Sequence, residues 1–125
     1  MLTACSLFVA HAAGGRAVEA ANTSPRRCIA LTFDDGPSQN TSHILDLLEE
    51  YDVRATFFVV GCQTVKDPDI VRRIAAEGHQ VGNHSYDHPQ LDSLTCAQAL
   101  ADLQKNDDLL RELLGEGDYW VRPPY

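Results

Sequence analysis

Five residues of chemically active types form three clusters along the 125-residue chain. Asp34 and Asp35 are adjacent, His84 and His88 lie four residues apart, and Arg122 begins the sequence Arg-Pro-Pro-Tyr. Two adjacent carboxylates can have different functions, one binding a metal ion and the other accepting a proton. One carboxylate and two imidazoles also make a suitable three-ligand set for a divalent metal, with positions left open for water. An arginine nearby could bind the remaining carboxylate.

Each cluster taken alone also has an ordinary structural explanation. Asp-Asp-Gly-Pro is common in turns, and two histidines at this spacing are structural more often than not. Pro89 disfavours the α conformation at His88, which favours a structured loop over a helix for this pair. The Arg-Pro-Pro-Tyr sequence could be a stiff loop. The stronger indication of chemistry is that all three clusters directly follow predicted strands.

Strands and helices alternate from residue 28 onward. Apolar runs predict strands over 28–33 and 55–60, a weaker strand over 79–82 and a fourth over 118–121. Helices are predicted between these strands, over 41–51, 67–78 and 95–114. This alternation predicts an α/β fold whose parallel strands are joined by right-handed crossovers. Because the carboxyl ends of parallel strands share one face, we expect the three clusters to meet there.

Other polar and aromatic residues have simpler expected roles. His43 is predicted to be exposed on a helix, and His79 to be a core or surface residue at the start of the third strand. Asp87 is expected to be a carboxylate on the surface of the loop that carries the two clustered histidines. Tyr119 and Trp120 alternate across the fourth predicted strand, where both are expected to pack.

Composition and charge exclude several classes of protein. Hydrophobic residues make up 44% and charged residues 22%, which is ordinary for one globular domain. Lys and Arg total 10 against 18 Asp and Glu, a net charge of -8. Nucleic-acid binding needs clustered cations, which this sequence lacks, so no nucleic-acid partner is predicted. The apolar run within residues 1–10 is too short for a transmembrane segment, which needs roughly 20 apolar residues.

Residues 1–27 differ from the remainder in being rich in small residues and lacking periodicity. A small-x-small cleavage site around His11 indicates a secretion signal, which would make the protein secreted or associated with the cell envelope. The lack of an early cation favours a disordered leader instead, and both explanations stay open. The cysteines show no C-x-x-C spacing, so they are either free thiols or, in a secreted protein, form one disulfide. They are Cys5, Cys28, Cys62 and Cys96.

The three clusters carry a resemblance to a known family. The segments 32–37 (TFDDGP), 84–89 (HSYDHP) and 122–125 (RPPY) resemble, in order and spacing, the first three motifs of the polysaccharide deacetylases. These proteins contain the NodB-homology domain of carbohydrate esterase family 4. The resemblance covers 28–125 and implies a distorted (β/α) barrel with parallel strands, of which this chain holds about half. It also implies metal-dependent removal of N- or O-acetyl groups from sugars.

The resemblance implies a role for each clustered residue. The metal ligands would be Asp35, His84 and His88, with zinc as the first choice and cobalt or another divalent ion as alternatives. Asp34 would be the general base that takes a proton from the attacking water. Arg122 would pair with Asp34 and orient it. The backbone N–H of Tyr125 would help to stabilise the oxyanion of the tetrahedral intermediate.

The expected function is that of a metal-dependent deacetylase acting on an acetylated polysaccharide or oligosaccharide. Chitin oligomers, peptidoglycan and acetylated xylan are all compatible substrates. Members of the family continue with two further motifs, the last of which supplies a histidine acid. We therefore expect 28–125 to be the N-terminal part of the domain and to turn over poorly alone. One alternative is an inactive remnant that binds metal and carbohydrate, and another is an unrelated metal-dependent amide hydrolase.

Overall fold

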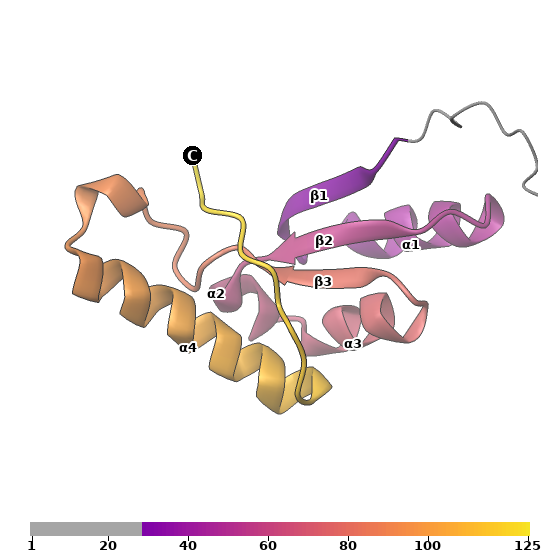
Figure 1. The fold of residues 1–125 in the computed structure, drawn as a ribbon. Coiled ribbons are helices and arrows are strands. Elements are labelled where there is room, and N and C mark those ends of the chain that lie inside the picture. Colours follow the sequence, from indigo (N-terminus) through magenta and orange to yellow (C-terminus); the bar gives the residue numbers. More distant parts are fainter. Residues whose placement is uncertain (1–28) are drawn as a thin grey trace, which may run out of the picture.

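The computed structural model of this protein describes residues 29–125 (Figure 1). The leader predicted over 1–27 lies outside these residues, as do Cys5 and Cys28. Strands and helices alternate as predicted. They are β1 (Leu31–Gly36), α1 (Thr41–Glu50), β2 (Ala55–Val59), α2 (Gly61–Thr64), α3 (Pro68–Ala76), β3 (Gln80–Asn83) and α4 (Cys96–Leu114), with a 3₁₀ turn at Leu91–Ser93.

The three strands form one parallel sheet in the order β1-β2-β3. Phe33 pairs with Phe57, and Phe57 in turn pairs with Val81. The sequence predicts that the first strand ends at Phe33, but β1 continues to Gly36, which pairs with Val59. The register shifts between Phe33 and Gly36, so the two aspartates occupy an irregular part of the strand instead of a turn after it.

The helices begin and end where their sequences provide the required caps. Thr95 and Gln98 form a reciprocal capping box at the start of α4. Pro68 occupies the first turn of α3, where a missing N–H costs nothing. Gly78 follows this helix with φ of +80°, a conformation that glycine adopts without strain. The short helix α2 was not predicted from the sequence, and its first turn forms because Val60 accepts hydrogen bonds from two later backbone N–H groups.

The hydrophobic core lies between the helices and one face of the sheet. The helices contribute Leu45, Leu48, Val71, Ile74 and Leu110, and the strands contribute Ala55, Phe57, Val59 and Val81. The rings of Phe33 and Phe57 stack with their centroids 5.0 Å apart. Truncation of a buried leucine or isoleucine to alanine costs about 2–5 kcal/mol, so this core fixes the strands whose ends carry the clusters. Within residues 29–125, no helix has the length and apolar character needed to cross a membrane.

The fourth predicted strand is the main error in the sequence-based fold. The only pairing it makes with the described strands is a single parallel bridge between Asn83 and Val121. The segment crosses the carboxyl end of β3 instead of running beside it, so the register cannot continue (Figure 1). The backbone of Asn83 donates to Trp120 O at 2.8 Å and accepts from Arg122 N at 3.0 Å, which fixes the crossing point.

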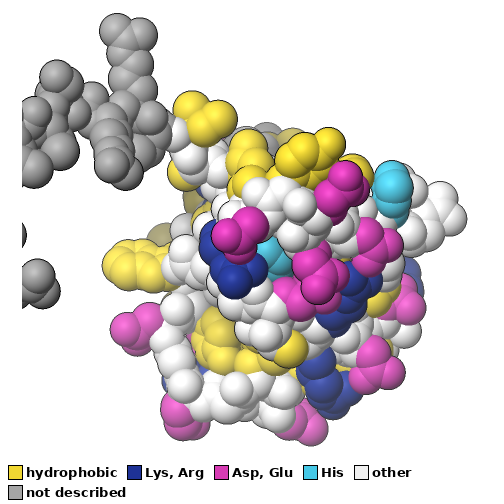
Figure 2. Space-filling model, turned by 90° about the vertical axis from the view of Figure 1, so that its right-hand side faces the viewer, with side chains coloured by type: hydrophobic (Ala, Val, Ile, Leu, Met, Phe, Trp, Pro, Cys, Tyr) yellow, Lys and Arg dark blue, Asp and Glu magenta, His cyan; other side chains and the backbone are white. Residues whose placement is uncertain are grey.

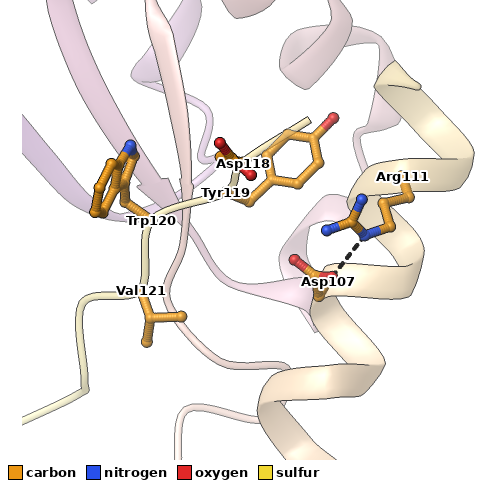
Figure 3. Close-up of a pocket in the computed structure, with 6 residues that line it drawn as sticks. All are labelled: Asp107, Arg111, Asp118, Tyr119, Trp120 and Val121. Carbon is orange, nitrogen blue, oxygen red and sulfur yellow. Dashed lines mark hydrogen bonds and ion pairs between the residues drawn. The ribbon is translucent and has the colours of Figure 1, made fainter. Parts of the chain in front are cut away.

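This C-terminal segment borders a pocket of about 380 Å³ beside α4 (Figure 3). Tyr119 points to the α4 side of the segment, where Arg111 binds Asp107 at 2.7 Å, and Trp120 points to the opposite side. Tyr119 packs against the core as predicted, whereas Trp120 is 66% exposed, so its predicted packing is wrong. The pocket contains none of the clustered aspartates and histidines and is not the candidate site.

His79 is buried at the end of the sheet where the strands begin, in agreement with a core role. Its Nδ1 accepts a hydrogen bond from the Ala55 N–H at 3.3 Å, and its ring lies against Phe57. Its Nε2 is 3.8 Å from a carboxylate oxygen of Glu77. The surface at this end of the molecule has acidic and basic side chains interspersed (Figure 2). Burial lowers the pKa of His79 below its ordinary value of 6.5, and Arg54 lowers it further against the opposing effect of Glu77.

We expect His79 to make the folded state less stable as the solution becomes acidic. Below pH 6.5 the unfolded chain binds a proton at this position more readily than the folded chain. As the pH is lowered below 6.5, the free energy of unfolding therefore decreases by up to about 1.4 kcal/mol per pH unit, until the pH reaches the folded-state pKa. Urea unfolding between pH 5 and 8 measures this slope. The variant His79→Gln should have a smaller slope, and His43→Gln, at an exposed position on α1, should match the wild type. Equal slopes for all three proteins would contradict the prediction.

Candidate metal centre

Asp35, His84 and His88 converge at the carboxyl ends of β1 and β3. One carboxylate oxygen of Asp35 lies 3.2 Å from His84 Nε2 and 2.9 Å from His88 Nε2. The ligand atoms of all three side chains lie within 4.8 Å of one another. His84 is buried, His88 is half-buried and Asp35 is exposed, so the cluster opens to solvent on one side. The arrangement matches the expectation from the strand order.

The spacing of these atoms fits a divalent metal ion. In a tetrahedral zinc site with bonds of about 2.0–2.1 Å, neighbouring ligand atoms lie roughly 3.3 Å apart. The two nitrogen-to-oxygen distances in this cluster, 3.2 and 2.9 Å, are close to that value. Two imidazoles and one carboxylate also have the donor chemistry that zinc and related ions bind. The residues present therefore suit a three-ligand site.

A hydrogen bond to the backbone orients the His84 ring so that its Nε2 could bind a metal ion. Its Nδ1 lies 2.7 Å from the carbonyl oxygen of Arg122. A carbonyl oxygen can only accept, so Nδ1 carries the proton and donates it, which leaves the lone pair of Nε2 free. Metal-binding histidines usually donate their second ring N–H in this way, which fixes the tautomer and the ring orientation.

Asp34 and Arg122 form a separate pair beside the cluster. The Arg122 guanidinium donates to the Asp34 carboxylate at 2.7 Å and to the Thr32 hydroxyl at 2.9 Å. It also lies 4.0 Å above the ring of Phe58, a favourable position for a cation. The two adjacent aspartates thus have different partners, because Asp34 is paired with a cation while Asp35 faces the histidines. The different partners are compatible with the separate functions that the sequence analysis expects for the two carboxylates.

Tyr125 also lies at the cluster. Its ring meets the ring of His88 edge to face, with the centroids 5.1 Å apart. The tyrosine is 89% exposed, so its ring lies between His88 and solvent-accessible space. This contact involves the side chain, whereas the role implied by the resemblance belongs to the backbone N–H.

Unusual backbone conformations concentrate at the same place. Positive φ angles occur at Asp35 (64°), Ser85 (65°), His88 (55°) and Tyr125 (61°). Non-glycine residues rarely adopt this left-handed region, and such strain persists only where the surroundings enforce it. The ligand-bearing segments are therefore held in conformations that the local sequence alone would not select.

A buried amide network that the sequence analysis missed supports these segments. The Asn83 side chain donates to Leu103 O at 2.9 Å and accepts from the Ser85 N–H at 2.9 Å. Asn106, also fully buried, donates to the side chain of Asn83 and to Val59 O. A signal was present in the sequence, because Asn106 lies at helical spacing between Leu103 and Leu110 on the face expected to be apolar.

Comparison with known proteins agrees with this geometry. The family model "Polysaccharide deacetylase" matches residues 21–125. The chain is 45% identical over 98 residues to a peptidoglycan-N-acetylglucosamine deacetylase of Bacillus cereus, a match that covers 78% of this chain and 36% of that protein. It is 40% identical over 102 residues to the chitin deacetylase of Colletotrichum lindemuthianum, covering 78% of this chain and 41% of the relative.

The structural comparison leads to the same group. A solved structure of the peptidoglycan deacetylase PdaC of Bacillus subtilis superposes with a TM-score of 0.77 at 42% identity, covering 81% of this chain and 50% of the chain in that structure. The chain thus spans about a third of the first of these curated relatives and half of this solved structure. The three-stranded parallel sheet with its helices confirms the expected α/β class, since these neighbours have the NodB (β/α) barrel fold. On the family match and these identities, the chain belongs to the polysaccharide deacetylase family.

Proposed function

We propose that this protein is a metal-dependent deacetylase that hydrolyses acetyl groups on a polysaccharide. One observation carries the proposal. The two adjacent aspartates have separate partners, Asp35 facing His84 and His88 while Asp34 is bound by Arg122. A hydrolase that activates water with a metal ion uses both functions next to each other, a metal site and a base beside it. The relatives named as deacetylases of peptidoglycan and chitin support the same reaction.

The ion that we propose is zinc, with cobalt or another divalent ion as a substitute, held by Asp35, His84 and His88. When bound, such an ion polarises the acetyl carbonyl and lowers the pKa of water from about 15.7 to roughly 7. Asp34 takes the proton of the attacking water, because its carboxylate adjoins the ligand set. Arg122 keeps this carboxylate in place through its hydrogen bond of 2.7 Å. The backbone N–H of Tyr125 donates to the oxyanion.

The substrate that we propose is an acetylated polysaccharide or oligosaccharide, with peptidoglycan and chitin-like oligomers as the main candidates. Two of the named relatives act on these two polymers. Because both polymers lie outside the cytoplasm, we further propose that the protein is secreted or associated with the cell envelope. Family membership removes the alternative of an unrelated amide hydrolase.

Acetate release tests the proposed function. The protein is incubated with peptidoglycan, chitin oligomers and acetylated xylan, with zinc or cobalt supplied and again after treatment with a chelator. We expect slow acetate release from at least one polymer, loss of this release after chelation, and its recovery when the ion is returned. Tight metal binding with no acetate from any of the three polymers would instead support the inactive remnant.

A further inference from the structure

The loop that carries both candidate histidine ligands is bound from one side by α4. The carboxylate of Asp102, on this helix, accepts hydrogen bonds from the backbone N–H of Tyr86 at 2.8 Å and of Asp87 at 3.1 Å. Both N–H groups belong to residues between His84 and His88. Each carboxylate oxygen therefore binds one peptide group of the loop, and charge-assisted bonds of this kind are stronger than neutral ones.

Helix α2 also binds this loop. The Gly61 N–H donates to Ser85 O at 3.0 Å, and the Cys62 N–H donates to Tyr86 O at 2.9 Å. Inside the loop, the His88 N–H donates to the Ser85 hydroxyl at 3.1 Å. The carbonyl groups of the loop are thus fixed by α2, while two of its N–H groups are fixed by Asp102.

The side chain of Tyr86 is enclosed between the same two helices. A Cβ atom at Gly61 would clash with the Tyr86 ring, so the ring packs directly on the α2 backbone. On the α4 side, Lys105 Nζ lies 3.4 Å from the ring centroid, in position for a cation–π contact. The loop has no regular secondary structure, so these contacts and the carboxylate of Asp102 determine its shape.

The loop needs such support because its backbone is strained. Ser85 and His88 both have positive φ angles, of 65° and 55°. Without external hydrogen bonds, neither residue would favour this conformation, and the His88 ring would move away from Asp35. The Asp102 bonds bridge the two strained positions, because Tyr86 and Asp87 lie between them.

We propose that Asp102 is a positioning residue for the metal centre. Its carboxylate holds the loop so that His84 Nε2 and His88 Nε2 stay at the spacing that one divalent ion requires, without itself touching the ion. This inference rests on the proposed function to the extent that the protein must bind such an ion. It assigns a role in the site to a residue that lies outside the three sequence motifs.

Two substitutions at this position should weaken metal binding in a graded way. Asp102→Ala removes both acceptors, whereas Asp102→Asn keeps one acceptor oxygen and turns an NH₂ group toward the other backbone N–H. Loss of an outer hydrogen-bond partner typically weakens metal binding about 10–100-fold. We expect Asp102→Ala to lie in that range for Zn²⁺, measured by competition with a chelating dye, with Asp102→Asn intermediate. The visible absorption spectrum of the Co²⁺-loaded variants should also change, because the ligand geometry relaxes.

Two control variants separate positioning from general stability. Asp108→Asn lies on the same helix, where the carboxylate is exposed and accepts a hydrogen bond from the side chain of Gln104, and it should match the wild type. Ile74→Val removes one methylene group from the buried face of α3 and should lower the melting temperature without changing zinc affinity. A zinc affinity that falls in Ile74→Val as much as in Asp102→Ala would overturn the positioning role.

The outcomes also distinguish this inference from the proposed function. Wild-type protein that binds neither Zn²⁺ nor Co²⁺ would overturn the proposed function and this inference with it. Wild-type protein that binds the ions while Asp102→Ala binds them equally well, with the same Co²⁺ spectrum, would overturn the inference alone.

Discussion

Replacing Asp34 with Asn should slow acetate release by about 10²–10⁴-fold while leaving the metal content of the protein unchanged. Positioned general bases contribute rate factors of this size. The amide has nearly the shape of the carboxylate, and its oxygen can still accept the hydrogen bond from Arg122, now 2.7 Å from Asp34. It cannot accept a proton from water at neutral pH. Steady-state kinetics on the best substrate, together with metal analysis of the same samples, measure both quantities.

The matched control for this variant is Asp52→Asn. Asp52 is exposed in the turn before β2 and has a positive φ of 49°, which asparagine tolerates. Its activity and metal content should equal those of the wild type. Loss of the metal from Asp34→Asn would mean that the roles of the two adjacent aspartates have been assigned the wrong way round.

Replacing His88 with Asn should abolish tight metal binding and, with it, all acetate release. Asparagine can keep the positive φ of 55° at this position, so the loop backbone is preserved. Its side chain is too short to place a donor where His88 Nε2 now lies, 2.9 Å from Asp35. Removal of an outer hydrogen-bond partner already weakens metal binding about 10–100-fold, and loss of a ligand should cost more. Titration with Zn²⁺ measures the change in affinity.

The exposed histidine on α1 provides the control for this variant. His43→Asn also removes one imidazole, at an exposed position on α1 that belongs to none of the three clusters, and should leave zinc affinity and stoichiometry unchanged. Zinc affinity in His88→Asn equal to that of the wild type would remove His88 from the ligand set. The centre would then need a third ligand other than this histidine.

Local sequence patterns were sufficient for most of the fold. Apolar runs and caps such as Thr95 and Pro68 are properties of neighbouring residues, so the helices and strands that they predict form close to the expected positions. The prediction of a fourth strand was wrong because strand pairing depends on residues that are distant in the sequence. The alternation of Tyr119 and Trp120 requires only an extended backbone. A strand also requires a neighbouring strand that pairs with it over several residues, and among the described strands this segment pairs with β3 at Asn83 alone.

The residue types of the candidate site and their order along the chain could be read directly from the sequence. Asp35, His84 and His88 are metal-ligand types placed at or just after the carboxyl ends of strands, and parallel strands must bring those ends to one edge. The orientation of these groups, in contrast, depends on contacts between distant parts of the chain. The bond between Arg122 and Asp34 joins residues 88 positions apart, and the Arg122 carbonyl fixes the proton of His84. The hydrogen bonds from the histidine loop to Asp102 likewise depend on where α4 packs. Such long-range contacts follow from the geometry of the crossovers and leave no local pattern in the sequence.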